Sequence, residues 1–240
     1  MQINYNVIKI SALLFVVIFL FAFSNQRNKN RKIYGEPEIR FLGKNTLFIT
    51  DKAVSKLLIQ NQRHVTNQSK DIIDLNALEL SLNSNLLIKK AEVFMSVNGK
   101  LSVEIEQKRP IARVNTNTPY YIAEQGNYMP LSPNYSARVP LVTGQIHKKD
   151  LSTVFEFAKA VDTDEFLKKH VIEIHQNKDK TIDFRVRKSD FKVHLGNLKQ
   201  LQKKINNFKV FYQKALKDNM LNHYKLVNLK FDKQVICTKK

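Results

Sequence analysis

The chain closes with a segment, YKLVNLKFDKQVICTKK, in which apolar and polar positions alternate. Its apolar positions are Val227, Leu229, Phe231, Val235 and Cys237, and the polar ones between them are Asn228, Lys230, Asp232 and Gln234. A period of two is that of a strand with one buried face. Because a last strand often lies at the edge of its sheet, where unpaired backbone N–H and C=O groups face outward, this segment is a candidate docking edge.

Residues 36–110 predict one α+β unit. In chain order the pattern gives a strand at 38–42, a helix that begins near Asp51, a polar loop at 61–70, a helix that Asp74 caps, and the strands LIKKAEVFMSV and KLSVEIEQ. Asn98-Gly99 between the last two strands is a strong hairpin signal. Arg109-Pro110 ends the hairpin, because proline cannot continue a ladder and biases the residue before it away from helix.

Residues 111–240 predict a second unit of mostly antiparallel strands with two helices, so the fold class is α+β. Its elements are a hairpin around Gly126, the extended VPLVTG, a helix that Asp150 caps, the strands VIEIHQN, TIDFRVR and FKVHLG, a long helix opened by Asn197, and the closing strand. The expected buried stripe of the long helix is Leu198, Leu201, Ile205, Phe208, Phe211 and Leu216. Its lysines indicate a solvated face, with a basic membrane-surface helix as the alternative.

The N-terminal segment from Val7 to Phe23 is strongly apolar and carries a single charge, Lys9. It has about the minimum length of a membrane-spanning helix, and predicts a short tail at 1–7, a transmembrane anchor at 8–24 and a basic linker at 25–35. The expected anchor residues are Ile8, Ile10, Leu13, Leu14, Phe15, Val16, Val17, Ile18, Phe19, Leu20, Phe21 and Phe23. Two other interpretations stay open: a signal peptide cleaved after residues 22–24, and a buried core helix.

The flanking charges conflict with an outward-facing C-terminal part. Four basic residues follow the apolar run, at Arg27, Lys29, Arg31 and Lys32, whereas Lys9 and the terminal amine lie on its other side. The positive-inside bias would keep the part after the run in the cytoplasm, although a long domain translocates largely regardless of such charges. Orientation is therefore not decided by charge alone.

Composition argues against most kinds of chemistry. Forty Lys and Arg against 21 Asp and Glu give a net charge of +19, which attracts polyanions, yet no zinc-finger spacing or RNA-binding signature accompanies it. The single cysteine excludes an intrachain disulfide, and the six histidines show no metal-ligand spacing. No nucleophile elbow, phosphate loop or dinucleotide motif occurs. The sequence predicts a protein without a catalytic, cofactor or metal site.

Several motifs resemble one family. The stretch LNALELSLNSNLLIKKAEVFMSVNGKLSVEIEQKRPIARV resembles the second half of a POTRA domain in the FtsQ/DivIB cell-division proteins. The stretches YYIAEQGNYMPLS and VPLVTG, the strand-to-helix passage VHLGNLKQLQKKINNF, and the ending LVNLKFDKQVIC are similar to that family's later motifs, in the same order. Three positions depart from the family's ending: Asn228 replaces an aspartate, Phe231 stands at an aromatic position where tyrosine is common, and a glycine expected near Lys233 is missing.

The resemblance implies a non-catalytic scaffold of the bacterial divisome, anchored in the inner membrane with its two domains in the periplasm at the division septum. It implies FtsB-type and FtsL-type partners, other divisome members on the POTRA domain, and no cofactor. The partner-binding residues that it implies are Val227, Asn228, Leu229, Lys230, Phe231, Asp232, Lys233, Gln234, Val235 and Ile236. The mechanism would be strand addition, in which the partner's backbone completes the edge ladder.

Two rival functions stay open. One is a POTRA-bearing factor for membrane transport or assembly, which would bind client segments through the helix and strand unit. The other is a membrane-anchored, nucleic-acid-binding protein that faces the cytoplasm, which the net charge of +19 favours. A C-terminal reporter that is active only outside the cytoplasm separates this last function from the others.

Overall fold

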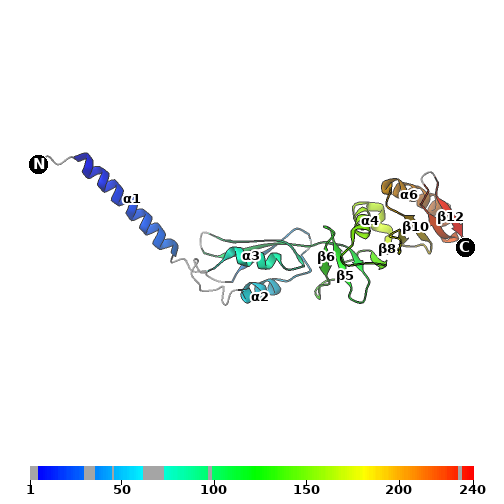
Figure 1. The fold of residues 1–240 in the computed structure, drawn as a ribbon, viewed down its shortest axis with the longest axis horizontal. Helices are drawn as coiled ribbons and strands as arrows, with labels where there is room; N and C mark the ends of the chain where they lie inside the picture. The colour runs from blue at the N-terminus through cyan, green and yellow to red at the C-terminus, as the bar shows by residue number, and fades with distance from the viewer. Residues whose placement is uncertain (1–4, 30–35, 45, 62–72, 97–98, 232–233) are drawn as a thin grey trace. The chain divides into compact units, whose positions relative to one another are not determined.

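The computed structural model describes the chain except residues 1–4, 30–35, 45, 62–72, 97–98 and 232–233 (Figure 1). The described residues form two compact units, Met1–Gln107 and Lys108–Lys240, which are taken separately below. The expected polar loop at 61–70 falls almost entirely outside the described residues, as does Asn98 of the expected hairpin turn.

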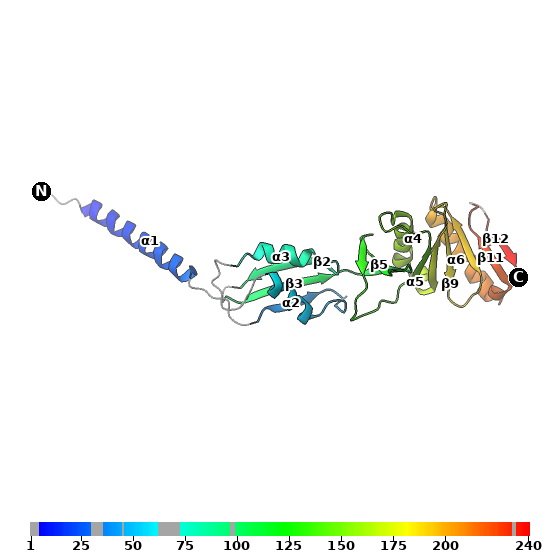
Figure 2. The same ribbon diagram turned by 60° about the horizontal axis from the view of Figure 1, so that its bottom comes forward.

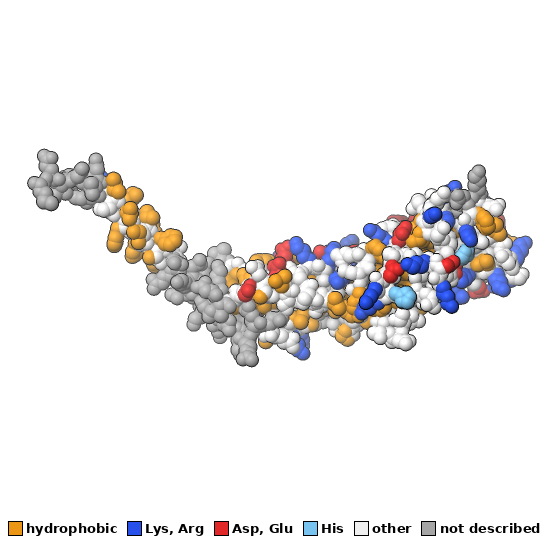
Figure 3. Space-filling view, viewed as in Figure 1, with side chains coloured by type: hydrophobic (Ala, Val, Ile, Leu, Met, Phe, Trp, Pro, Cys, Tyr) orange, Lys and Arg blue, Asp and Glu red, His pale blue; other side chains and the backbone are white. Residues whose placement is uncertain are grey.

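The N-terminal segment is a helix, α1, at Tyr5–Lys29, which begins before and ends after the expected 8–24. From Ile10 to Phe23 its apolar side chains are exposed, and Figure 3 shows them along the helix. Within the described residues, no helix combines the length and the apolar character needed to cross a bilayer. The prediction of a transmembrane helix is therefore not confirmed, and the uncharged stretch that suggested it is shorter than the roughly 20 residues that a bilayer core requires.

The first unit contains the strands and helices that the sequence predicts, in the same order. They are β1 (Glu38–Leu42), α2 (Asp51–Asn61), α3 (Leu75–Asn83), β2 (Ile88–Met95) and β3 (Leu101–Gln107). Within the described part, β3 lies between β1, to which it is parallel, and β2, to which it is antiparallel. Asp74 caps α3 as expected, because its Oδ1 accepts a hydrogen bond from the Ala77 N–H at 2.9 Å.

One buried side chain fixes the end of this sheet to the start of α2. Gln107 Oε1 accepts hydrogen bonds from the N–H groups of Phe48 (2.9 Å) and Ile49 (3.2 Å), and its Nε2 donates to the Ile49 carbonyl at 3.0 Å. A buried amide is tolerated only when such partners are present. Gln107 therefore joins the end of β3 to the segment just before α2 through hydrogen bonds inside the apolar core.

The second unit carries a long mixed sheet. Its strands are β4 (Pro110–Val114), β5 (Tyr120–Ala123), β6 (Tyr128–Pro130), β7 (Leu141–Gly144), β8 (Val171–Gln176), β9 (Ile182–Val186), β10 (Lys192–Gly196), β11 (Tyr224–Asn228) and β12 (Ile236–Lys239). Among the described residues they lie in the order β12-β11-β10-β9-β8-β7-β4-β5-β6. Most neighbours are antiparallel, as expected, but β4 and β7, β7 and β8, and β10 and β11 are parallel.

Helices cover one face of this sheet. They are α4 (Ser152–Thr163), α5 (Glu165–His170), α6 (Leu201–Lys217) and the 3-10 turn η2 (Leu221–His223). Buried residues of α4 and α6 form one core with alternate strand residues, among them Ile174, Phe184, Val193 and Val227. Figure 2 shows both helices beside the strands of this sheet. Successive strand residues point to opposite faces, so the residues between those four lie on the face away from the helices.

Two helix caps differ from the expectation. Asp150 does not cap α4; its carboxylate instead accepts from Ser152 Oγ (2.7 Å) and Lys180 Nζ (2.8 Å), and the Lys180 contact lowers the pKa of Asp150 to about 2. Asn197 does not open α6 either, because that helix begins at Leu201. Both errors have one cause: a polar residue near a helix start caps it only at one backbone position.

The buried stripe of α6 is also shifted from the predicted one. Leu216 is exposed, whereas Lys204 is buried, with 4% of its surface exposed. Its ammonium donates to the carbonyls of Leu195 (3.1 Å) and Asn197 (2.7 Å), which satisfies the charge within the strand-to-helix connection. The sequence pattern also missed α5, a short helix that Asp164 caps through the N–H groups of Phe166 and Leu167, at 3.0 Å each.

Candidate functional site at the C-terminal edge of the sheet

The closing segment is a hairpin of two strands rather than a single strand. β11 lies inside the sheet, parallel to β10 on one side and antiparallel to β12 on the other, and β12 is the edge. The apolar positions kept the same parity on both sides of the short polar interruption before Val235, so the pattern was interpreted as one strand. The expected edge therefore exists, but it lies on β12, which begins at the last of the ten predicted residues.

The ten predicted residues are spread over three environments. Val227 and Asn228 belong to β11; Leu229, Lys230, Phe231, Gln234 and Val235 belong to the connection; Ile236 begins β12; and Asp232 and Lys233 lie outside the described residues. The side chains of Val227 and Leu229 are buried. Phe231 and Ile236 are 44% and 41% exposed, so they are the large apolar side chains that a partner can contact here.

Asn228 determines where β11 ends. Its Oδ1 accepts a hydrogen bond from the Lys230 N–H at 2.9 Å, which turns the backbone. The Leu229 N–H donates to the His194 carbonyl at 2.9 Å, so the contact with β10 extends one residue beyond the end of β11. Asn228 also faces Ile236 across the hairpin. The aspartate expected at this position would offer an equivalent side-chain oxygen. Asparagine can therefore accept the hydrogen bond that forms this turn as well as aspartate can.

The edge of β12 differs from the outer edge of β2 and from the β6 end of the long sheet, whereas β1 also pairs, within the described residues, on one side only, with β3. In the first unit, Asn83 Oδ1 accepts from the Ala91 N–H (2.8 Å), and Asn83 Nδ2 donates to the Ala91 carbonyl (3.1 Å), so α3 blocks the outer edge of β2. At the other end of the long sheet, β6 has three residues and ends in Pro130, which has no N–H. In the described part of the chain, β12 pairs with β11 alone.

A polar row leads across the open face of the sheet toward this edge. Strand pairing places His175, Asp183, His194, Asn228 and Ile236 in succession on β8, β9, β10, β11 and β12. A second row runs beside it through Glu173, Arg185, Lys192, Leu226 and Thr238. In both rows, charged side chains lie in the middle of the sheet, on β9 and β10, and uncharged ones lie on β11 and β12.

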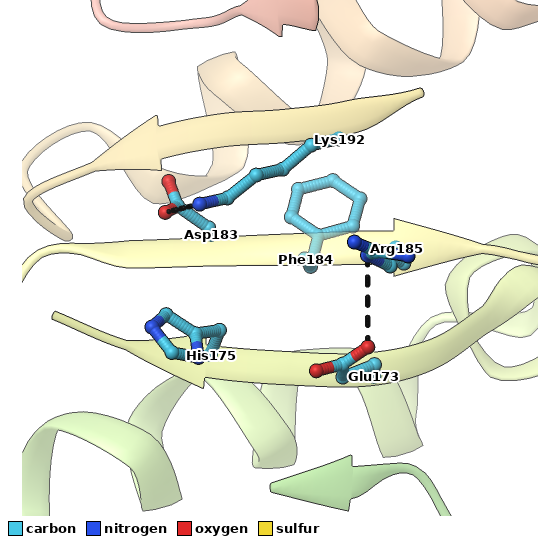
Figure 4. Close-up of a pocket in the computed structure, with 6 residues that line it drawn as sticks. All are labelled: Glu173, His175, Asp183, Phe184, Arg185 and Lys192. Carbon is cyan, nitrogen blue, oxygen red and sulfur yellow. Dashed lines mark ion pairs between the residues drawn. The ribbon is translucent and has the colours of Figure 1, made fainter. Parts of the chain in front are cut away.

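Asp183 is the centre of the ionic part. Figure 4 shows it facing Lys192, whose Nζ lies 2.6 Å from Asp183 Oδ2. His194 Nδ1 lies 2.5 Å from the other oxygen, and Asn177 donates at 2.9 Å. Burial raises the pKa of Asp183, but the hydrogen bonds from Lys192, Asn177 and His194 outweigh it and leave the pKa below its ordinary value. The carboxylate stays charged at neutral pH and is fully partnered.

This ionic cluster does not form a small-molecule site. The hollow above it encloses about 180 Å³, and the charged side chains that line it are paired with one another, Glu173 with Arg185 and Asp183 with Lys192. Within the described residues no group of three or more His, Cys, Asp or Glu is placed to hold a metal ion. The cluster instead stiffens β8, β9 and β10, which support the terminal hairpin.

Cys237 and the rest of β12 were not among the predicted site residues, apart from Ile236. Cys237 faces Val227 across the hairpin and packs against the core, and its burial raises the pKa of the thiol. The neighbours Thr238 and Lys239 are exposed. The sequence did contain an indication of this strand. Three β-branched residues occur in VICT, directly after the polar run DKQ, which is typical of a second short strand.

An arginine at the start of the second unit was also missed as a structural residue. Arg109 binds Asp162 on α4 through two parallel hydrogen bonds of 2.8 and 2.6 Å, and its Nε donates to Glu124 at 2.9 Å. These contacts hold the pKa of Asp162 below its ordinary value, despite partial burial. The R-P-I-A motif therefore joins the entry of β4 to a helix and to the β5–β6 hairpin.

Comparison with protein families agrees with this architecture. Residues 43–106 match the model of the POTRA-like domain, which identifies the first unit as a module of that class. Residues 109–238, more than half of the chain, match the family described as FtsQ/DivIB, C-terminal related. The chain belongs to the FtsQ/DivIB family, a family of non-catalytic cell-division proteins, as its motifs suggested. No curated protein matches the chain.

Proposed function

We propose that this protein is a division scaffold that captures an extended segment of an FtsB-type or FtsL-type partner on the outer edge of β12. The observation that carries the proposal is that the backbone of β12 pairs on one side only, in the described part of the chain. A row of outward N–H and C=O groups is a template for one more strand. Family membership supports the biological setting.

The rows across the open face specify the side chains of the partner. A strand added to β12 continues both rows, so alternate partner residues lie beside Ile236 and Thr238. Cross-strand contact with Ile236 favours an apolar or aromatic partner residue. Residues on the other face of the added strand lie near Lys239, which favours an acidic residue there. This charge contribution is a surface effect and decreases with salt.

Attachment to a membrane is the second part of the proposal. The apolar side chains of α1 from Ile10 to Phe23 are exposed. Contact of so many apolar side chains with water is unfavourable, so their burial against another apolar surface is favoured. Burial of these residues in the lipid would hold the protein at the inner membrane, with both units in the periplasm at the septum. Activity of a C-terminal reporter that works only outside the cytoplasm supports this orientation, and inactivity contradicts it.

Two matched substitutions test the docking edge. Ile236→Lys adds a charge on the edge strand, whereas Ile172→Lys adds the same charge on β8, an interior strand, at an isoleucine with the same 41% exposure. We expect Ile236→Lys to weaken co-purification with FtsB-type and FtsL-type proteins by about tenfold or more, because an edge charge opposes strand addition. Ile172→Lys should leave capture unchanged.

A backbone substitution tests the mechanism itself. Thr238→Pro removes one N–H from β12, which either deprives the partner of a hydrogen bond or loosens β12 from β11. Either way, capture should be lost. Retention of full capture by both Thr238→Pro and Ile236→Lys would show that the partner binds elsewhere.

A further inference from the structure

A second concave site lies near the opposite end of the long sheet from β12. It is a hollow of about 240 Å³, and its lining residues are Thr116, Thr118, Tyr120, Tyr128, Ile146 and Lys148. The connection from β4 to β5 supplies the two threonines, β5 and β6 supply the tyrosines, and the segment after β7 supplies the last two residues. All of these belong to the second unit.

The described residues give the buried hydroxyl of Tyr120 no hydrogen-bond partner. Tyr120 is 4% exposed, and in the described part of the chain its hydroxyl is a buried polar atom without a hydrogen-bond partner. The adjacent Tyr121 differs, because its hydroxyl accepts from the Ala137 N–H at 3.0 Å and contacts Ser136 Oγ at 3.3 Å. An unpaired buried hydroxyl is unfavourable, and phenylalanine would fill the same space without one.

A positive charge lines the same hollow as Tyr120. Lys148 Nζ lies 3.5 Å from the centroid of the Tyr128 ring, and that ring packs against Tyr120 with centroids 5.2 Å apart. Lys148 forms no ion pair with another residue that the structure describes. Burial and, to a lesser degree, Tyr128 raise the pKa of Tyr120, so its hydroxyl keeps its proton and can donate.

We propose that this hollow binds a carboxylate, presented by an acidic residue of a peptide segment. Lys148 would supply the opposite charge, Tyr120 a donated hydrogen bond once the group enters, and Thr118 a further hydroxyl. Phosphate would carry more negative charge than the one cation of the lining, Lys148, balances, and the lining contains no arginine for bidentate recognition. The second unit would then hold one segment along β12 and an acidic side chain near its other end.

Titration of the full chain with four probes tests the proposal. The probes are a short blocked peptide with one central glutamate, the same peptide with glutamine, acetate, and inorganic phosphate, each followed by amide chemical shifts. We expect the glutamate peptide to shift residues 116–118, Tyr120 and Lys148 saturably, and glutamine to weaken binding by about tenfold, the usual effect of losing a charged hydrogen bond. Weaker binding of acetate supports a peptide as the source, and equal binding supports a free carboxylate.

Three variants give the matched comparison. Tyr120→Phe should lose about tenfold in affinity for the glutamate peptide while its thermal stability is kept or raised, because the variant removes an unpaired hydroxyl. Lys148→Met should lose at least about as much. Lys159→Met is the control, since its ammonium also lies over a ring, 5.7 Å from the centroid of Phe155, but outside the hollow.

The proposal is overturned by preferential binding of phosphate, by the absence of saturable shifts around Lys148, or by a Tyr120→Phe variant that loses stability but keeps its affinity for the peptide. These results are separate from those on β12, since capture of the division partners is measured with different variants and a different ligand.

Discussion

The two ends of the long sheet share one core but present different edges. At one end, β6 has three residues, stops at Pro130, and places Tyr128 between the Tyr120 ring and the Lys148 ammonium. At the other end, β12 contains no proline and pairs with β11 alone among the described strands. Both end strands pair on one side only among the described residues, but Pro130 removes a backbone N–H from β6, whereas β12 keeps its N–H groups, which makes β12 the better candidate for strand addition.

The largest expected effect tests whether the two ends are equally well packed. Leu229→Ala and Met129→Ala each remove a buried side chain, one near each end, and each should lower the free energy of unfolding by about 3 kcal/mol. Urea denaturation followed by circular dichroism measures both. A cost below about 1 kcal/mol for Leu229→Ala alone would show that the β12 end is loosely packed. The unpaired edge of β12 would then reflect local unfolding rather than a stable docking edge.

A smaller loss is expected from the ionic row that supports the β12 end. Asp183→Ala leaves Lys192 and His194 without their carboxylate and should cost about 2 kcal/mol. Glu173→Gln is the control, because its contact with Arg185 is 3.7 Å long and contributes about 0–1 kcal/mol, and glutamine keeps an oxygen for the hydrogen bond from Thr143 Oγ1 (2.9 Å). Equal costs for the two variants would contradict the central role of Asp183.

The pH dependence of unfolding should follow the same carboxylates. The pKa values of Asp162 and Asp183 are lowered in the folded state, so each stabilises the fold fully above the unfolded pKa of about 4. This contribution is lost as the pH falls through the folded-state pKa. We expect stability to decrease below about pH 4, and Asp183→Asn to flatten that decrease in a series of urea titrations. An unchanged slope would show that other groups control acid unfolding.

The smallest change in stability is expected at the closed edge. Pro130→Thr restores an N–H on β6 and should alter the free energy of unfolding by less than about 0.5 kcal/mol, as surface substitutions usually do. Its expected effect is on self-association, measured by light scattering, because it lengthens the edge that can pair. Pro133→Thr, outside the strand, is the control. Monomeric behaviour of Pro130→Thr would show that something besides proline closes this edge.

Local patterns were enough where an element's own residues decide its structure. The hairpin around Gly126, the cap at Asp74 and the buried stripe of α4 at Val154, Phe157, Ala158 and Val161 all agree with the sequence. The same holds for the strands β8, β9 and β10. In these cases turn chemistry and side-chain period act within a few residues, so long-range contacts do not change the outcome.

Other features depended on long-range partners. Lys204 is buried because two distant carbonyls accept its protons, and no period along α6 predicts such acceptors. The closing segment alternates on both sides of a short polar interruption, and the Asn228 turn and pairing with both β10 and β12 divide it into two strands. The hollow around Tyr120 joins residues from three separate connections and strands.

The sequence by itself determined the order of the elements in the first unit, the family and the presence of a strand-forming terminus, because these follow from local period, turn residues and motif order. Only the tertiary structure decided which strand is the edge. Alternation shows that a strand has a buried face, but an edge is defined by the absence of a neighbour, and neighbours are set by pairing between distant segments. The candidate docking surface therefore lies on β12, beyond most of the residues that the pattern indicated.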